Sequence, residues 1–198
     1  MLVIIFLVFG FLFFVFRQLK TTKSQKIMIE HKQKEISDSI NYAKRIQDAM
    51  MTSSINIKEI INEYFIFFKP KDVVSGDFYW VHQNQEGDIF FTVADCTGHG
   101  VPGAFMSMIG TSLLNEIIVE KKISNTDEIL FLLRSQIIKA LNQNDVESQK
   151  DGMDISLCRL NIKKREIQFS GALNPMLYVS GDKLTMIKGD PQPIGYSG

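Results

Sequence analysis

Two glycine-rich segments each carry an aspartate in a setting where a carboxylate could do chemistry. The first reads Ser-Gly-Asp-Phe around Asp77, and the second reads Asp-Cys-Thr-Gly-His-Gly-Val-Pro-Gly-Ala from Asp95 onward. Asp77 begins a predicted strand that continues over Phe78–His82. Asp95 ends a second predicted strand that starts at Ile89, and the turn-forming run Asn-Gln-Glu-Gly-Asp lies between the two. Because the strands of a hairpin are antiparallel, we expect the two carboxylates to meet at one edge of the sheet.

Two adjacent carboxylates repel each other, and a divalent cation between them removes the repulsion. Hard oxygen ligands of this kind suit Mg²⁺ or Mn²⁺ better than zinc. Glycines such as Gly76 and Gly100 let the backbone approach an ion or a phosphate closely, and the second segment leads into a helix N-terminus at Ala104, which favours anions. The alternative is that Asp77 and Asp95 are ordinary strand-end or capping residues. Spacing alone leaves both interpretations open.

The elements that would hold these segments change in type along the chain. After the hairpin, apolar residues recur at helical spacing over Ala104–Lys121 and over Asp127–Asn142, with Thr126 as the expected N-cap. Further strands are predicted over 155–162, 167–171, 176–179 and 183–187. Two strands, two helices and then a run of antiparallel strands predict an α+β domain.

The first 16 residues contain no charge, and only Gly10 interrupts their apolar character. A helix of that length spans about 24 Å, which is short of the ~30 Å hydrocarbon core. Three interpretations compete: a short transmembrane helix, the end of a longer span, and a signal-peptide core. The six basic and two acidic residues of Arg17–Glu35 follow the apolar run, which favours a membrane anchor over a signal peptide. The positive-inside rule then predicts a single-pass protein of the inner or plasma membrane with its remainder in the cytoplasm.

Residues 24–65 contain no proline or glycine and are predicted to be helical. Apolar residues recur every seven positions from Ile29 to Met50, while Gln33 and Gln47 occupy the matching seam positions. One interpretation is a parallel coiled coil that makes the chain a homodimer and passes a signal from the membrane. The other is a solvated linker helix. Polar seam positions weaken a coiled coil, so both interpretations stay open.

Composition sets further limits. The 198 residues carry 22 basic and 22 acidic side chains, and this balance gives no support to nucleic-acid binding. The two cysteines, Cys96 and Cys158, lie far apart and form no Cys-x-x-Cys pair, so they indicate neither a disulfide framework nor a zinc site, and we expect neither to be a nucleophile. The chain therefore divides into a membrane segment (1–16), a juxtamembrane helix or coiled coil (17–65) and a globular domain (66–198).

Two segments, Ser75–Tyr79 and Asp95–Ala104, resemble the signatures of the PPM-type (protein phosphatase 2C-like) metal-dependent serine/threonine phosphatases. The similarity is greatest to the bacterial branch of stage II sporulation protein E and the sigma-factor regulators. It extends from about Phe68 to the end of the chain, and Gly152–Leu157 and Ser170–Pro175 also fit it. The resemblance implies an antiparallel β-sandwich flanked by helices. It also implies hydrolysis of phosphoserine or phosphothreonine on a regulatory protein, such as an anti-sigma-factor antagonist, in bacterial signal transduction.

The resemblance further implies a site for two ions, Mn²⁺ or Mg²⁺. Asp95 would bridge the two ions, the backbone carbonyl of Cys96 would bind one of them, and Asp77 would hold the second. A metal-bound water would be the nucleophile, so no covalent enzyme intermediate is required. Lys71 stands where the family often has a basic residue and could meet the phosphate, although a solvated lysine is the alternative.

Other residues of these segments are open between a site role and a structural role. His99 could act as a general acid or meet the phosphate, or it could make a structural hydrogen bond in its glycine-rich turn. Gly100, next to it, is predicted to approach the phosphate through its backbone. Asp154 is another candidate acid, but a local structural role is favoured, because it lies in a segment that the family uses mainly for its sheet.

The sequence departs from the family at its C-terminal end. The family pattern continues past Pro193–Gly195 with two further aspartate motifs, whereas this chain stops at Gly198. We therefore expect a C-terminally truncated domain that binds metal weakly, leaves a sheet edge uncovered and has little phosphatase activity. Intact Asp77 and Asp95 favour a membrane-anchored phosphatase over the alternative, a catalytically inactive signalling or dimerisation module. A purely structural membrane tether would give the glycine-rich Asp95 loop no purpose.

Overall fold

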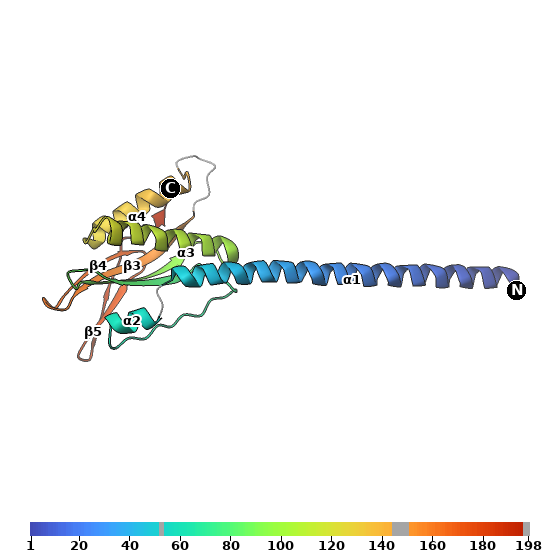
Figure 1. Ribbon diagram of the computed structural model, residues 1–198, viewed down its shortest axis with the longest axis horizontal. Coiled ribbons are helices and arrows are strands. Elements are labelled where there is room, and N and C mark those ends of the chain that lie inside the picture. The colour runs from blue at the N-terminus through green and yellow to red at the C-terminus, as the bar shows by residue number, and fades with distance from the viewer. Residues whose placement is uncertain (52–53, 144–150, 196–198) are drawn as a thin grey trace. The chain divides into compact units, whose positions relative to one another are not determined.

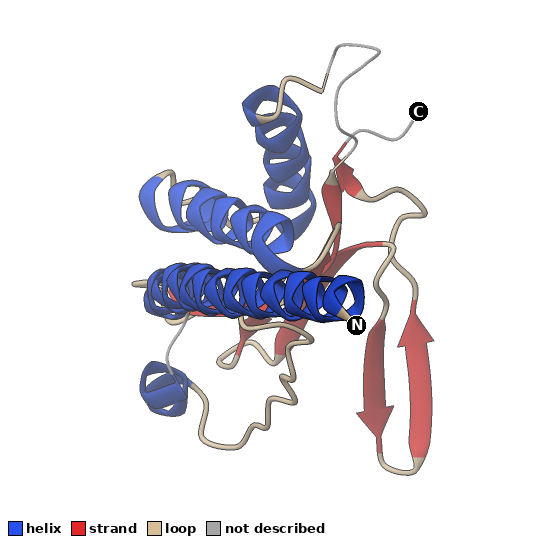
Figure 2. Cartoon of the chain, turned by 90° about the vertical axis from the view of Figure 1, so that its right-hand side faces the viewer, coloured by secondary structure: helices blue, strands red, loops and turns tan. Residues whose placement is uncertain are grey.

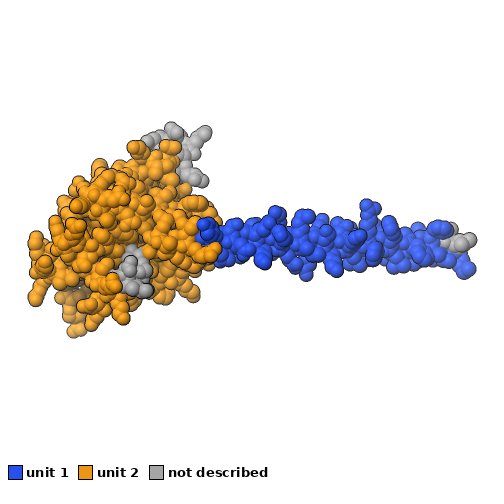
Figure 3. Space-filling model, viewed as in Figure 1, with its two compact units in different colours: residues 1–42 blue, residues 43–198 orange. Residues whose placement is uncertain are grey.

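The computed structural model describes residues 1–51, 54–143 and 151–195 of the chain. The chain forms two compact units, Met1–Tyr42 and Ala43–Gly198, which are coloured separately in Figure 3. The candidate site residues all belong to the second unit.

Helix α1 (Leu2–Met50) accounts for the first unit and continues into the second. Its apolar N-terminal side chains are exposed, Phe6 by 77%. Farther along, the helix is polar and carries ion pairs one turn apart, such as Lys26–Glu30 at 3.8 Å. The stretch Ile4–Met50 includes a window apolar enough to cross a membrane, and none of that window is buried. The N-terminal end of α1 is therefore a candidate membrane span, as the sequence predicts.

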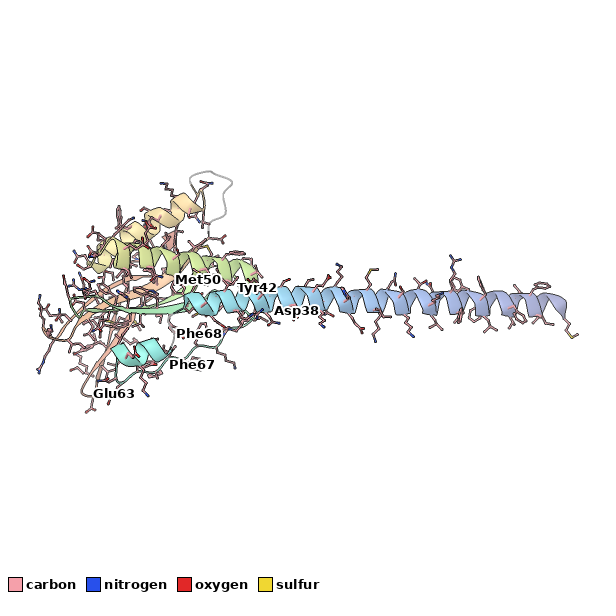
Figure 4. The ribbon with its side chains drawn as sticks, viewed as in Figure 1. Asp38, Tyr42, Met50, Glu63, Phe67 and Phe68 are labelled. Carbon is pink, nitrogen blue, oxygen red and sulfur yellow. The ribbon has the colours of Figure 1, made fainter. Side chains whose placement is uncertain are left out.

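The predicted helix over 24–65 is interrupted before its end. Helix α1 stops at Met50, a short helix α2 covers Ser54–Ile60, and no further helix precedes the first strand. The prediction was therefore too long at its C-terminal end. The segment after α2 is rich in aromatic residues, which disfavour helix. One of them, Phe68 (labelled in Figure 4), packs its ring edge-on against Tyr79 with the centroids 5.6 Å apart.

A five-stranded antiparallel sheet is the centre of the second unit (Figure 1). Its strands occur in the spatial order β1-β2-β3-β4, and β7 pairs with the beginning of β3. Their bounds are Phe78–Gln83 (β1), Ile89–Cys96 (β2), Gly152–Asn161 (β3), Glu166–Ala172 (β4) and Ile194–Gly195 (β7). Each of the predicted strands is present, and β3 begins three residues earlier than predicted.

The predicted hairpin of β1 and β2 is confirmed. Its turn is closed by the Asn84 side chain, whose Oδ1 accepts hydrogen bonds from the backbone of Glu86 and Asp88 at 3.1 and 2.8 Å. Gly87 takes a φ of +91°, which glycine adopts without strain. The turn fixes the register of the whole hairpin and so of the strand ends that carry Asp77 and Asp95.

Helices cover one face of the sheet (Figure 2). They are α3 (Gly100–Leu114), the π-helical turn η1 (Asn115–Glu120) and α4 (Thr126–Ala140). The core lies between this layer and the sheet, where Phe78, Leu157 and the α4 residue Leu133 belong to one buried cluster. Helix α3 starts four residues before the predicted Ala104. Its third residue is Pro102, which the first turn of a helix tolerates because the first N–H groups need no intrahelical partner.

The predicted N-cap of α4 is wrong by one residue. Asn125 occupies that position in an extended conformation, and Thr126 is the first helical residue. The Thr126 hydroxyl shares a 2.8 Å hydrogen bond with the Ser170 hydroxyl on β4. The threonine therefore joins the helix to the sheet.

Strands β5 (Met176–Ser180) and β6 (Lys183–Ile187) form a separate two-stranded antiparallel sheet. Figure 2 shows this hairpin apart from the main sheet. Most of its side chains are exposed, including Val179 and Leu184, which are directly opposite each other. The architecture is α+β with two antiparallel sheets and flanking helices, as predicted.

Candidate functional site

Three aspartates form a row across neighbouring strands. The β1–β2 register pairs Phe78 with Ala94, so the next residues in that register are Asp77 and Asp95. The β2–β3 register pairs Asp95 with Asp154. Residues directly opposite each other on antiparallel strands point to the same face. The three carboxylates therefore share one face at one end of the sheet.

This face is the one turned away from the helical core. Along β2, Ala94 and Cys96 are buried, whereas Asp95 between them is exposed. Asp77 is also exposed, while Phe78 beside it is buried in the core. The alternation of the strands thus presents the carboxylates to solvent without removing apolar side chains from the core.

The charges of these carboxylates interact. Partial desolvation raises the pKa of the largely exposed Asp77 above its usual 3.8, and a side-chain hydrogen bond with Asp95 and the negative charge of Asp95 raise it further. The pKa of Asp154 is also raised, by burial and then by the charge of Asp95. The site therefore favours an additional positive charge, either a proton or a cation.

Asp154 lies opposite Asp95, a position that the sequence interpretation did not give it, because a local structural role was favoured over its alternative as a candidate acid. Its expected local structural role gave no reason to place it beside Asp95. The register of β2 against β3 brings them together, and that pairing depends on a connection of more than fifty residues. Strand alternation alone could assign Asp154 to a face of the sheet, but it could not identify the residue opposite it on the neighbouring strand.

Backbone packing joins the two aspartate segments. A Cβ atom built on Gly76 would lie 2.8 Å from the carbonyl oxygen of Gly98 and 3.3 Å from that of Cys96. A Cβ atom on Gly103 would lie 2.6 Å from the Gly98 oxygen and 3.0 Å from the Cα of Gly76. Gly98 itself has a φ of +85°. The glycines are therefore required for close approach of the segments as well as for turning the chain.

Cys96 presents its backbone rather than its thiol to this region. Its side chain is buried on the core face. Burial, followed by the charges of Asp95 and Asp77, raises the pKa of the thiol. The thiol thus stays protonated, and the carbonyl oxygen that approaches Gly76 is the group available as a ligand. The second cysteine, Cys158, is also buried, and burial raises its pKa to about 12, which agrees with the expectation that neither cysteine is a nucleophile.

His99 makes a hydrogen bond across the two segments. Its Nδ1 lies 2.8 Å from Oδ2 of Asp72, and both side chains are exposed. Asp72 precedes Asp77 by five residues. The contact therefore joins the loop before β1 to the loop after β2, in addition to the backbone packing at Gly76. Gly100 follows His99 with a φ of +65°, and its Cβ position would lie 3.6 Å from the same Asp72 oxygen. The structural hydrogen bond considered for His99 is therefore present.

Lys71 lies next to Asp72 in the same loop and is exposed. Among the residues that the structure describes, no carboxylate forms an ion pair with it. Its side chain remains available either to solvent, as the sequence interpretation allowed, or to an anion.

Gln47 of α1 is a second residue that the sequence interpretation missed at the site. It is only 2% exposed. Its Nε2 donates to the carbonyl of Ser75 at 2.6 Å and to the hydroxyl of Ser107 at 2.8 Å, while its Oε1 accepts from the Ser75 N–H at 3.1 Å. The amide thus holds the peptide two residues before Asp77. The heptad pattern predicted this glutamine in a coiled-coil seam, but its hydrogen bonds are made within its own chain.

The donor set fits a hard divalent cation in chemistry. Asp77 and Asp95 supply carboxylate oxygens that repel each other without a cation, and the Cys96 carbonyl lies close by. Within residues 1–51, 54–143 and 151–195, however, no group of three or more His, Cys, Asp or Glu side chains is arranged to hold a metal ion. Among the described residues, these donors alone do not complete a metal site.

Comparison with known proteins identifies the fold. The family model of stage II sporulation protein E (SpoIIE) matches residues 85–198, more than half of the chain. The chain belongs to the SpoIIE family. None of the curated proteins matches it.

Two solved structures are similar to this SpoIIE-family chain. The SiaA-PP2C domain of Pseudomonas aeruginosa is 30% identical, with a TM-score of 0.73 over 82% of this chain and 64% of that one. The PP2C phosphatase domain and regulatory fragment of SpoIIE from Bacillus subtilis is 18% identical, with a TM-score of 0.49 over 62% and 34% of the two chains. This chain thus spans less than two thirds of the length of either structure. The PPM-type phosphatase fold predicted from the sequence is confirmed by the family match and by the SiaA domain.

We predict that the carboxylate pair of Asp77 and Asp95 destabilises the metal-free domain of this SpoIIE-family chain. Because the folded-state pKa of Asp77 is raised, the stabilisation from its bound proton is present below pH 3.8 and is lost as the pH rises through the raised value. Asp95→Asn removes the neighbouring charge but leaves the effect of burial. We expect the metal-free variant to be more stable than the wild type at pH 7, by less than about 1 kcal/mol because both groups are exposed.

Urea denaturation at pH 7 and pH 4 measures this difference, which should narrow at the lower pH. Mn²⁺ should stabilise the wild type more than the variant. Asp182→Asn, in the exposed turn between β5 and β6, removes the same charge and should give no pH-dependent difference. A wild type more stable than Asp95→Asn at pH 7 without metal would contradict the repulsion.

Proposed function

We propose that this chain belongs to a membrane-anchored protein phosphatase that hydrolyses phosphoserine or phosphothreonine on a regulatory protein. The phosphatase-like fold is established by the family and the SiaA-PP2C similarity. The observation that supports the activity most directly is the Asp77–Asp95 pair, which meets at the sheet end with a raised Asp77 pKa. Bound cations stabilise such a pair, whereas in a domain without them the repulsion between the two carboxylates would lower stability.

The proposed roles follow the geometry. Asp77, Asp95 and the Cys96 carbonyl would hold Mn²⁺ or Mg²⁺, with two ions in the complete site. Bound ions of this kind lower the pKa of a coordinated water and stabilise negative charge on phosphoryl oxygens. Lys71 and the backbone at Gly100 would meet the phosphate. The hydrogen bond between Asp72 and His99, and the closeness of Gly100 to the same Asp72 oxygen, support a shared location for these residues.

The proposed partners include the membrane, a phosphorylated regulatory protein such as an anti-sigma-factor antagonist, and a second copy of the chain. The apolar start of α1 and the basic residues after it support a single span with the phosphatase unit in the cytoplasm. A homodimer through residues 24–65 would use the seam that begins at Ile29, which is 62% exposed. Gln47 would not take part, because it is buried within its own chain.

Phosphopeptide hydrolysis by the protein expressed from its complete gene tests the activity. We expect turnover that requires Mn²⁺ or Mg²⁺, falls to the background rate in Asp95→Ala and is unchanged in Asp182→Ala. Circular dichroism of Asp95→Ala should match the wild type, so that lost activity reports the site and not the fold. The 198-residue chain alone is expected to show little turnover, because its described residues supply few ligands.

The second candidate is a catalytically inactive signalling module of the same fold. The incomplete ligand group among the described residues favours it. It predicts a complete gene product that folds and binds a phosphoprotein but hydrolyses no phosphopeptide in the presence of either ion. Metal-dependent turnover would exclude this candidate.

A further inference from the structure

Three basic residues of α1 form a cluster that the phosphatase site does not use. Arg17, Lys20 and Lys23 directly follow the uncharged run of residues 1–16, and we name these three residues the basic collar. All three side chains are exposed. We propose that the basic collar binds the headgroups of anionic lipids, an inference that rests on the proposed membrane anchor.

The first observation is that the collar has no acidic neighbour. The first acidic residue of the chain is Glu30. Lysines farther along the helix are already paired, Lys26 with Glu30 at 3.8 Å and Lys32 with Glu35 at 2.8 Å. Among the residues that the structure describes, no carboxylate lies within ion-pair distance of the collar. Its three charges therefore lack compensation from the protein.

The second observation is the helical spacing of the collar. Arg17, Lys20 and Lys23 are three residues apart, so at about 100° per residue they fall within one sector of about 120°. Three positive charges on one side of a helix repel one another mildly, and a shared anion offsets that repulsion. In Figure 4 the side chains along this part of α1 project freely from the helix.

The third observation is the depth of the collar. At 1.5 Å per residue, Arg17, Lys20 and Lys23 lie about 1.5, 6 and 10.5 Å beyond Phe16, the last residue of the apolar run. The headgroup layer on each side of a bilayer is about 5–7 Å thick. Arg17 and Lys20 then lie at phosphate depth, and the flexible Lys23 side chain can reach back to it. Continuity with the apolar run thus brings anionic lipid phosphates to the collar.

Energy transfer from a fluorescent donor to labelled lipids tests the inference. The donor is attached at Ser24→Cys in the full chain, since Cys96 and Cys158 are buried. Phosphatidylcholine vesicles carry a trace of acceptor-labelled phosphatidylglycerol or, in parallel, acceptor-labelled phosphatidylcholine. We expect the labelled phosphatidylglycerol to be enriched around the helix about fivefold at low salt, and the enrichment to fall toward unity in 1 M NaCl.

Two variants with equal loss of charge separate the collar from general basicity. The variant R17Q/K20Q/K23Q should lose the enrichment. The variant K26Q/K32Q/K34Q removes three charges from the same helix but beyond the headgroup layer, and it should retain the enrichment. Equal enrichment of the two labelled lipids around the wild type, or equal loss in both variants, would overturn the inference.

Flotation distinguishes this inference from the anchor on which it rests. A chain that floats with pure phosphatidylcholine vesicles after a 1 M NaCl wash, yet shows no preference for the anionic lipid, keeps the anchor and overturns the collar. A chain that floats only with vesicles containing phosphatidylglycerol, and is released by salt, overturns the anchor and supports the collar. A chain that floats with neither overturns both.

Discussion

Replacing Gly103 with alanine is expected to destabilise the second unit by about 2–3 kcal/mol and to weaken Mn²⁺ binding by the protein that still folds. The new Cβ would lie 2.6 Å from the carbonyl oxygen of Gly98 and 3.0 Å from the Cα of Gly76. Both are backbone atoms, which cannot rotate away as a side chain can. The gain in helix propensity, about 1 kcal/mol, offsets only part of this clash. To relieve it, the segments that carry Asp77 and Asp95 must separate.

Gly110→Ala, in the same helix, is the comparison for the Gly103 variant. A Cβ at Gly110 would approach the ends of two side chains, 2.9 Å from Cε of Met153 and 3.0 Å from Cζ of Phe78. The methionine can change rotamer, so a smaller loss of about 1 kcal/mol is expected, with Mn²⁺ affinity retained. Urea denaturation and calorimetric titration with Mn²⁺ measure both quantities. Equal effects of the two substitutions would show that the backbone contact between the segments has no special importance.

The hairpin was predictable because its signals are local. The turn cluster from Asn84 to Asp88 and the alternation of β2 fix which residues pair, and pairing alone brings Asp77 to Asp95. The family signatures occupy the same segments, so the two lines of reasoning agreed on these residues. Local sequence was therefore sufficient to predict both the pairing of β1 with β2 and the acidic pair of Asp77 and Asp95.

The residues that the sequence did not place depend on contacts between distant segments. Asp154 reaches Asp95 through the pairing of β2 with β3, and Gln47 reaches Ser75 across 28 positions of the chain. The heptad pattern could not identify the environment of Gln47, because a polar residue in an apolar stripe is typical both of a coiled-coil seam and of a buried hydrogen bond within the chain. Only the surroundings of the helix distinguish the two environments.

This difference has a functional meaning for α1. A helix that ended in solvent would make no contact with the second unit. The last turns of α1 belong to the second unit, where the Gln47 amide pairs with the peptide of Ser75, two residues from Asp77. A displacement of these turns would break hydrogen bonds to the segment that carries a proposed metal ligand. We therefore expect Gln47 to act as a positioning residue for Asp77.

Gln47→Leu is accordingly expected to destabilise the second unit by about 2–3 kcal/mol and to weaken Mn²⁺ binding. Leucine has a similar size but cannot accept from the Ser75 N–H, and a buried donor without a partner costs about 1–3 kcal/mol in addition to the lost hydrogen bonds. Gln33→Leu, on the exposed part of the same helix, makes the identical change at the matching heptad position and should stay within about 0.5 kcal/mol of the wild type. Urea denaturation gives the stability, and Mn²⁺ titration under conditions where both variants are folded gives the affinity. If Gln47→Leu lost stability but bound Mn²⁺ like the wild type, the amide would hold the fold together without positioning Asp77, and the link from α1 to the site would have to run through other residues.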